Sequence, residues 1–257
     1  MQQNTLLVIF AVINVLVVGI FATTIMRQYL RRQRLAQLYW SIALIMAFIA
    51  TLAYILLVVG TPTSENGRFF FRLYYTLGAA WTPAWLGLGS VALVSKRRVT
   101  LTCFLLLCAA SLFALITISE APMNIDVLAR VAGTPGTGIL QPGKWLPAII
   151  VLNTLGVVAV VGVAIYSGWQ LLRRRTSVAG FQTKHLLWAN LLILAGDLFN
   201  AAAGSLARAF GLSSSFWLIM ALGWIIFYAG VLLTSQRKRT EQKAEPAIDT
   251  PKQHVSL

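Results

Sequence analysis

Seven long apolar runs recur along the chain, and they constrain its fold more than any other feature of the sequence. About 20 apolar residues form a helix long enough to cross the hydrocarbon core of a bilayer, where a helix satisfies its own backbone groups. We therefore predict an all-α integral membrane bundle of seven transmembrane helices in a single domain, residues 1–238. The predicted spans are residues 5–26, 38–60, 70–94, 99–119, 146–172, 185–209 and 215–235.

Composition agrees with this class, because 58% of the 257 residues are hydrophobic and only 11% are charged, against roughly a quarter charged in soluble proteins. The N-terminus lacks the basic stretch that precedes the apolar core of a secretory signal, so the first run is expected to be retained as a helix. Residues 239–257 are charged and contain proline, which predicts a disordered tail.

The positive charges alternate from one connection to the next, and this pattern predicts the orientation of the bundle. The first, third and fifth connections and the tail carry 16 Lys or Arg, whereas 5 lie on the other side. The positive-inside rule then puts the N-terminus outside and the C-terminus in the cytoplasm of a bacterial-type cytoplasmic membrane. Because the net charge of +14 is concentrated at helix ends and forms no basic face interleaved with aromatics, no nucleic-acid partner is expected.

The first three spans resemble the last three, with the fourth span between them. The segment "VVGIFATTIMRQYLRRQR" at 17–34 is similar to "VVGVAIYSGWQLLRRR" at 160–175, and Trp40 and Trp188 occupy matching offsets in the spans that follow. One interpretation is a 3+1+3 arrangement of parallel repeats, found in some transporters, in which the site lies between the halves. The other is chance similarity between apolar sequences of low complexity.

The longest predicted outside loop, residues 120–146, has a second half rich in glycine and proline that is expected to be irregular. Its first half predicts a short helix over 122–132, with Ile125, Leu128 and Val131 on one side. Such a helix would lie on the membrane surface or cover a cavity. A packed loop is the favoured alternative.

The sixth span carries a carboxylate, Asp197, near its middle, where a charge costs on the order of 3 kcal/mol. Each helical residue turns by about 100°, which gathers polar and small residues on one face that is expected to point into the bundle. These residues are Asn190, Asp197, Asn200, Ala201, Gly204 and, at the outer interface, Arg208. Asp197 either binds a substrate or a proton, or it forms a structural hydrogen bond in which Asn190 and Asn200, or a Tyr or Trp, hold its carboxyl group.

Aromatic side chains form a second group of candidates. Trp217, Trp224 and Tyr228 make one stripe on the seventh span, and Tyr74, Tyr75, Trp81 and Trp85 occur in the third span. In the third span Pro83 frees a backbone carbonyl, and Gly78, Gly87 and Gly89 permit close helix contact. The aromatics are able to line a pocket for a flat or apolar ligand. Ordinary packing and an interfacial belt also explain them and are favoured.

Several kinds of chemistry do not fit the sequence. No lysine lies inside a predicted span, which argues against covalently bound retinal, and His185 and His254 lie at a helix end and in the tail, which argues against bis-histidine haem. Cys103 and Cys108 point to different sides of one helix, so no disulfide is expected. No cluster has metal-ligand spacing, and no nucleophile has an evident base. We therefore expect neither an enzyme nor a resident cofactor or metal.

Two segments resemble sequences of a known kind. They are "LYYTLGAAWTPAWLGLGSVALV" at 73–94 and "FWLIMALGWIIFYAG" at 216–230. Both are similar to segments of an uncharacterised group of bacterial seven-helix multi-pass membrane proteins. The resemblance implies the membrane bundle and no particular activity.

Three functions remain open from the sequence. The first is small-solute or ligand handling, by a transporter or a ligand-binding bundle, with a site walled by Asp197, Asn190, Asn200 and the aromatics of the third and seventh spans. The second is a non-catalytic subunit of a larger membrane complex, in contact with partner helices or pigment. The third is a sensor that acts through a partner. The expected partners are the lipid bilayer and either other membrane subunits or an apolar small molecule.

Overall fold

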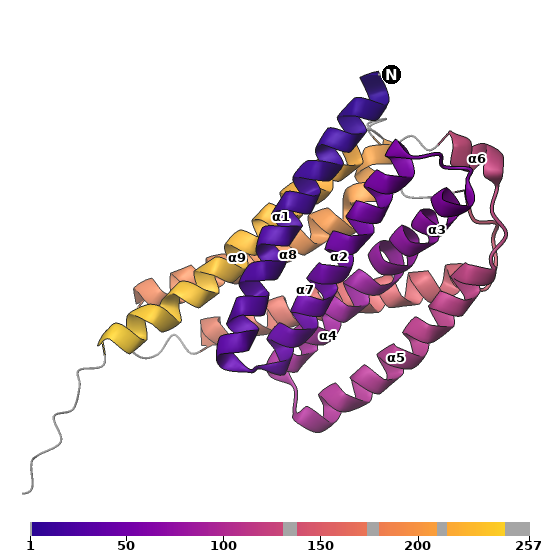
Figure 1. Ribbon diagram of the computed structural model, residues 1–257. Helices are drawn as coiled ribbons and strands as arrows, with labels where there is room; N and C mark the ends of the chain where they lie inside the picture. The colour runs from indigo at the N-terminus through magenta and orange to yellow at the C-terminus, as the bar shows by residue number, and fades with distance from the viewer. Residues whose placement is uncertain (1, 131–137, 174–179, 210–214, 245–257) are drawn as a thin grey trace, which may run out of the picture.

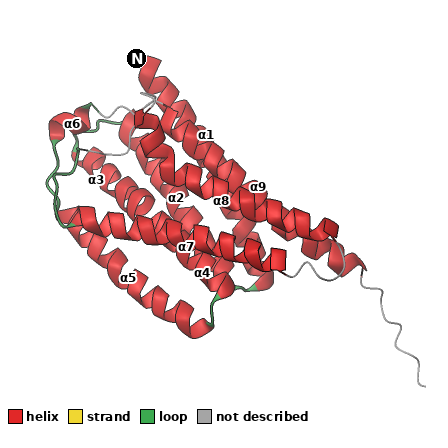
Figure 2. Ribbon diagram, turned by 180° about the vertical axis from the view of Figure 1, so that it is seen from behind, coloured by secondary structure: helices red, strands yellow, loops and turns green. Residues whose placement is uncertain are grey.

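The computed structural model describes residues 2–130, 138–173, 180–209 and 215–244 (Figure 1). Its elements in chain order are α1 (Gln2–Arg32), α2 (Leu35–Val59), α3 (Glu65–Tyr74), the π-helix η1 (Tyr75–Trp81), α4 (Thr82–Val94), α5 (Arg97–Glu120), α6 (Ile125–Ala129), α7 (Trp145–Arg173), α8 (Gly180–Ala209) and α9 (Phe216–Ala244). In these ranges the helices are joined by loops, and the β-structure is limited to one bridge between Met123 and Leu140 (Figure 2).

Seven helical spans in the described chain are long and apolar enough to cross a membrane, which confirms the predicted all-α bundle. The third span is composite, because α3, η1 and α4 follow one another without a break. The chain is therefore a polytopic membrane protein. Helix α9 reaches Ala244, six residues into the predicted tail, and residues 245–257 lie outside the described part of the chain.

Six of the spans close into a ring. Each packs against the next in the order α1, α2, α4, α7, α8 and α9, and α9 packs against α1. One end of the ring, called here the basic end, holds the helix ends near Arg32, Lys96 and Arg173. The opposite end, called here the loop end, holds the connections at 60–64 and 121–144. The two halves predicted from the sequence, before and after α5, follow one another around the ring.

Helix α5 lies outside the ring, where it packs against α4, α7 and η1 (Figure 1). Only 17% of the residues in its most apolar segment are buried, against 28% or more in every ring span. The large apolar side chains that α5 exposes are therefore free to face lipid.

Glycines bring neighbouring ring helices into backbone contact. A Cβ added to Gly87 would lie 2.8 Å from the Cα of Gly156, and one added to Gly78 or Gly89 would meet α2. On the other side of the ring, a Cβ at Gly196 of α8 would lie 2.7 Å from a carbonyl oxygen of α9. Small residues of this kind allow membrane helices to approach closely. The predicted role of the glycines of the third span is confirmed.

The described parts of the loop, residues 120–130 and 138–146, are packed against the bundle, as the favoured interpretation expects. Leu128 is fully buried, the Arg72 guanidinium donates a hydrogen bond to the Ala121 carbonyl, and the Asn124 N–H donates to the Ile139 carbonyl. Helix α6 is shorter than the predicted 122–132, because Asn124 caps its start through its side chain and the bridge holds the preceding residue. Of the three residues predicted to share one side of this helix, Leu128 is buried and Ile125 is exposed. The third, Val131, lies outside the described residues.

Substitution of Gly156 tests the close contact between α4 and α7. In Gly156→Ala the new Cβ would meet the Pro83 carbonyl and lie 2.7 Å from the Ala84 nitrogen, so the two helices must separate. We expect a loss of about 1–3 kcal/mol in unfolding free energy, seen as a lower Tm in detergent. The matched control is Gly162→Ala on the same helix, where the added Cβ meets nothing within 4 Å. Equal Tm values for the two variants would contradict the contact.

Candidate functional site

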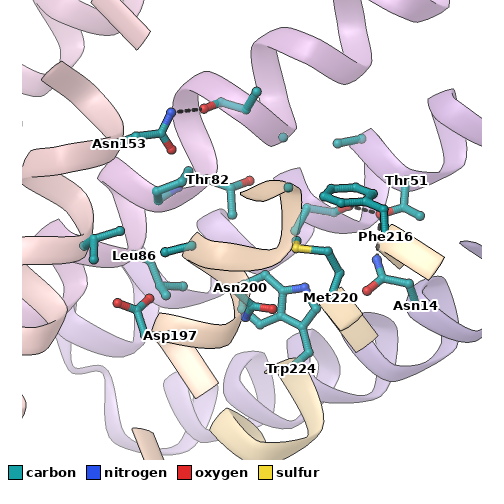
Figure 3. A pocket seen from close by; sticks show the side chains of 18 of the residues that line it. Asn14, Thr51, Thr82, Leu86, Asn153, Asp197, Asn200, Phe216, Met220 and Trp224 are labelled. Carbon is teal, nitrogen blue, oxygen red and sulfur yellow. Dashed lines mark hydrogen bonds between the residues drawn. The ribbon is translucent and has the colours of Figure 1, made fainter. Parts of the chain in front are cut away.

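A central cavity of about 500 Å³ lies inside the ring, in the half toward the loop end. Residues from all six ring spans line it, and Figure 3 labels ten of them. Its polar lining consists of Asn14, Thr51, Thr82, Asn153, Thr154, Asp197 and Asn200. Its aromatic lining consists of Tyr74, Phe216, Trp217 and Trp224. A concave apolar space with a few convergent polar groups is the usual form of a small-molecule site.

Asp197 occupies the deep end of this cavity. Helix α8 runs from the basic end to the loop end, and Asp197 is the α8 lining residue nearest the basic end, close to Leu86 and Trp224 (Figure 3). Only 7% of its surface is exposed. Its Oδ2 atom is buried and has no hydrogen-bond partner among the described residues. The carboxylate therefore faces inward, as the sequence predicts.

Other buried polar atoms of the lining also have no partner in the described part of the chain. They are the Oδ1 atoms of Asn14 and Asn200 and the indole N–H groups of Trp217 and Trp224. Asn14 is otherwise engaged, because its amide nitrogen donates to the Thr51 hydroxyl at 3.0 Å. Buried polar groups are rarely left unpaired in folded proteins, so the cavity offers these groups to water or to a polar ligand.

The π-helix η1 interrupts the wall of the cavity. Pro83 lacks the N–H that would bond the Ala79 carbonyl in an α-helix. The Asn153 amide of α7 donates to that carbonyl instead, at 2.6 Å, and the Thr82 hydroxyl donates to the Leu77 carbonyl at 2.8 Å (Figure 3). The predicted freeing of a carbonyl by Pro83 is confirmed. Single π-turns inside membrane helices often occur at functional sites.

A second cavity, of about 370 Å³, lies in the other half of the ring at the basic end. All six ring helices contribute to it as well. Its polar lining consists of Gln28, Arg32, Arg34, Gln37, Ser167, Gln170, Asn190 and Thr234. The two cavities therefore follow one another along the axis of the ring.

An apolar layer, called here the septum, separates the two cavities. It contains Phe21, Leu44, Val160 and Phe227, each of which lies along its helix between residues of the central cavity and residues of the basic-end cavity. These side chains are at most 2% exposed, and the Phe21 and Phe227 rings are 5.6 Å apart. The septum thus lies between the two cavities and consists of buried apolar side chains.

The residues predicted for one site line two different cavities in the structure. Asp197, Asn200, Trp217 and Trp224 line the central cavity, as expected. Asn190 lines the basic-end cavity, because it is seven residues from Asp197, or about 10 Å along the helix axis. The side chain of Arg208 lies outside the described side chains.

Four predicted aromatics are not among the lining residues of either cavity. The Trp81 indole donates to the Ser111 carbonyl of α5, and Trp85 packs against Phe104 of α5 with a ring distance of 5.9 Å. Tyr75 stacks on Phe71, with ring centroids 5.5 Å apart, and the Tyr228 hydroxyl bonds that of Thr24. For Tyr75, Trp81, Trp85 and Tyr228 the packing interpretation therefore holds.

No family model, curated protein or solved structure matches this chain. The resemblance to bacterial seven-helix proteins, the orientation and the subunit and sensor hypotheses accordingly stay predictions. The fold and the site together define a polytopic membrane protein with a polar cavity inside a closed ring of helices.

A double-mutant cycle tests the bond between Asn153 and the Ala79 carbonyl. Asn153→Leu leaves that carbonyl without its donor, and we expect a loss of about 1 kcal/mol, the usual size of a hydrogen bond between membrane helices. In a Pro83→Ala background residue 83 regains its N–H and supplies the missing donor, so the same change should cost less. Unfolding of all four proteins in detergent measures both costs, and equal costs in the two backgrounds would refute the assignment.

Proposed function

We propose that this protein is a small-solute transporter whose substrate moves along the axis of the six-helix ring. One observation carries the proposal: the same six helices line two polar cavities on one axis, with a thin apolar septum between them. A protein that only holds its helices together has no need of polar cavities on both sides of a septum. Movement of the helices about the septum would expose the substrate site to one end and then to the other.

The order of the helices around the ring supports the proposal. In that order α1 lies opposite α7, α2 opposite α8, and α4 opposite α9. Two parallel repeats related by an axis along the membrane normal would have this arrangement, with α5 as the extra helix outside. The two halves differ in detail, since Trp40 is buried whereas Trp188, at the matching offset, is 60% exposed. We include this 3+1+3 duplication in the proposal.

The composite third span supports movement in particular. The π-helix and Pro83 interrupt the regular backbone at the wall of the central cavity. Irregular turns of this kind inside a helix frequently occur at functional sites. They leave backbone carbonyls within reach of side chains and allow one half of a helix to tilt against the other.

A substitution that fills the central cavity tests the proposed function. Ala201 lines the cavity and is accessible, so the Ala201→Trp indole should occupy the space of a ligand. The matched control is Ala109→Trp on the exposed face of α5, outside the ring.

We would screen small solutes for an increase in the Tm of the purified wild-type protein, because a ligand at about 100 times its Kd stabilises by about 2.7 kcal/mol.

Each solute found in the screen would then be tested for uptake into proteoliposomes. We expect saturable uptake by the wild type and by Ala109→Trp, and loss of both binding and uptake in Ala201→Trp. Solutes that stabilise Ala201→Trp as much as the wild type, or that bind the cavity without being taken up, would contradict the proposal.

A further inference from the structure

The lining of the central cavity carries one formal charge. Among its lining residues, all of them described, Asp197 is the sole carboxylate, and none is a lysine, arginine or histidine. A carboxyl group buried at membrane depth keeps its charge only when an opposite charge lies beside it, and otherwise it binds a proton. Because the lining supplies no positive charge, a positively charged ligand is the natural partner of this carboxylate.

The unpaired oxygen atoms of the lining suit the same kind of ligand. Asp197 Oδ2, Asn14 Oδ1 and Asn200 Oδ1 are all hydrogen-bond acceptors, and each is buried without a donor in the described chain. The Asn200 oxygen comes from the same face of α8 as the carboxylate and lies against Gly223 of α9. An ammonium group offers N–H donors and no acceptors, so it complements these atoms.

The aromatic wall adds a third contribution. Trp224 belongs to the deep end of the cavity with Asp197, and Trp217 packs against Tyr74 at a ring distance of 5.9 Å on the side toward the loop end. Cations are attracted to the faces of tryptophan rings within about 6 Å. Much of the remaining wall is apolar and suits the hydrocarbon part of a small amine.

We infer that the substrate is a small organic amine with one positive charge, whose ammonium group lies beside Asp197 and the tryptophan rings and whose apolar part lies against the apolar remainder of the wall. This inference rests on the proposed transport function and names the class of its substrate. A cavity of about 500 Å³ accommodates such a molecule with its bound water.

The test uses three probes of nearly equal size that differ in charge: phenethylamine, 2-phenylethanol and phenylacetate. Binding to the purified protein is measured by calorimetry at one pH and one ionic strength. We expect phenethylamine to bind roughly 10- to 100-fold more tightly than 2-phenylethanol, as a charge-assisted hydrogen bond implies, and phenylacetate to bind weakest.

Variants then assign the preference to one carboxylate. Asp197→Asn should bring phenethylamine to within about threefold of 2-phenylethanol, a difference of less than 1 kcal/mol, whereas Asp197→Glu should retain most of the preference. The matched control is Asp126→Asn, which neutralises an exposed carboxylate of α6 and should change nothing. The elution profile and Tm of each variant verify that it is folded.

The outcomes separate this inference from the proposed function. Equal binding of the amine and the alcohol, or an amine preference that survives in Asp197→Asn, would overturn the substrate class and leave transport through the cavity standing. The substrate class would also be overturned, and transport would stand, if the solutes that the wild type takes up and Ala201→Trp does not are neutral or anionic. If no solute is taken up, the proposed function itself fails.

Discussion

A carboxylate in the middle of a membrane-spanning helix has to face away from lipid, and the arrangement of the whole bundle is consistent with this constraint. Asp197 is buried on the inner face of α8, and the six ring spans close around the space that it faces. The fourth span has no such group and lies outside. The polar side chains of the ring therefore collect inside it, while apolar side chains remain on the surface that faces the bilayer.

Two local features, close glycine contacts and a π-helix, shape the ring. Glycine contacts, such as that between Gly87 and Gly156, bring neighbouring helices together without large side chains. The π-helix before Pro83 breaks the regular backbone beside the cavity, and Asn153 satisfies the freed carbonyl from a second helix. A ring of helices with one irregular wall suits a site that must hold a solute and then release it.

Angular periodicity predicted much of this from the sequence, and its limits explain the rest. The length of the apolar runs identified the spans, and angular periodicity identified the inward face with Asp197 and Asn200, because both depend only on residues within one helix. It grouped Asn190 with Asp197, because a helical wheel ignores distance along the axis, and the septum separates the two. Periodicity within single helices does not predict where α5 lies relative to the ring, so the packing of Trp81 against α5 was not predicted. Asn14 was not identified as a site residue, although it is the one amide in its apolar span.

The most direct test of a route divided by a septum is the accessibility of each cavity from each end. Cysteines introduced by Ala201→Cys or Asn190→Cys, in a Cys103→Ala/Cys108→Ala background, would be exposed in oriented vesicles to a small membrane-impermeant maleimide. In the conformation that the structure shows, with no solute added, we predict that reagent at the loop end labels the first cysteine faster and that reagent at the basic end labels the second faster. The opposite order, or equal labelling of each cysteine from the two ends, would contradict the account.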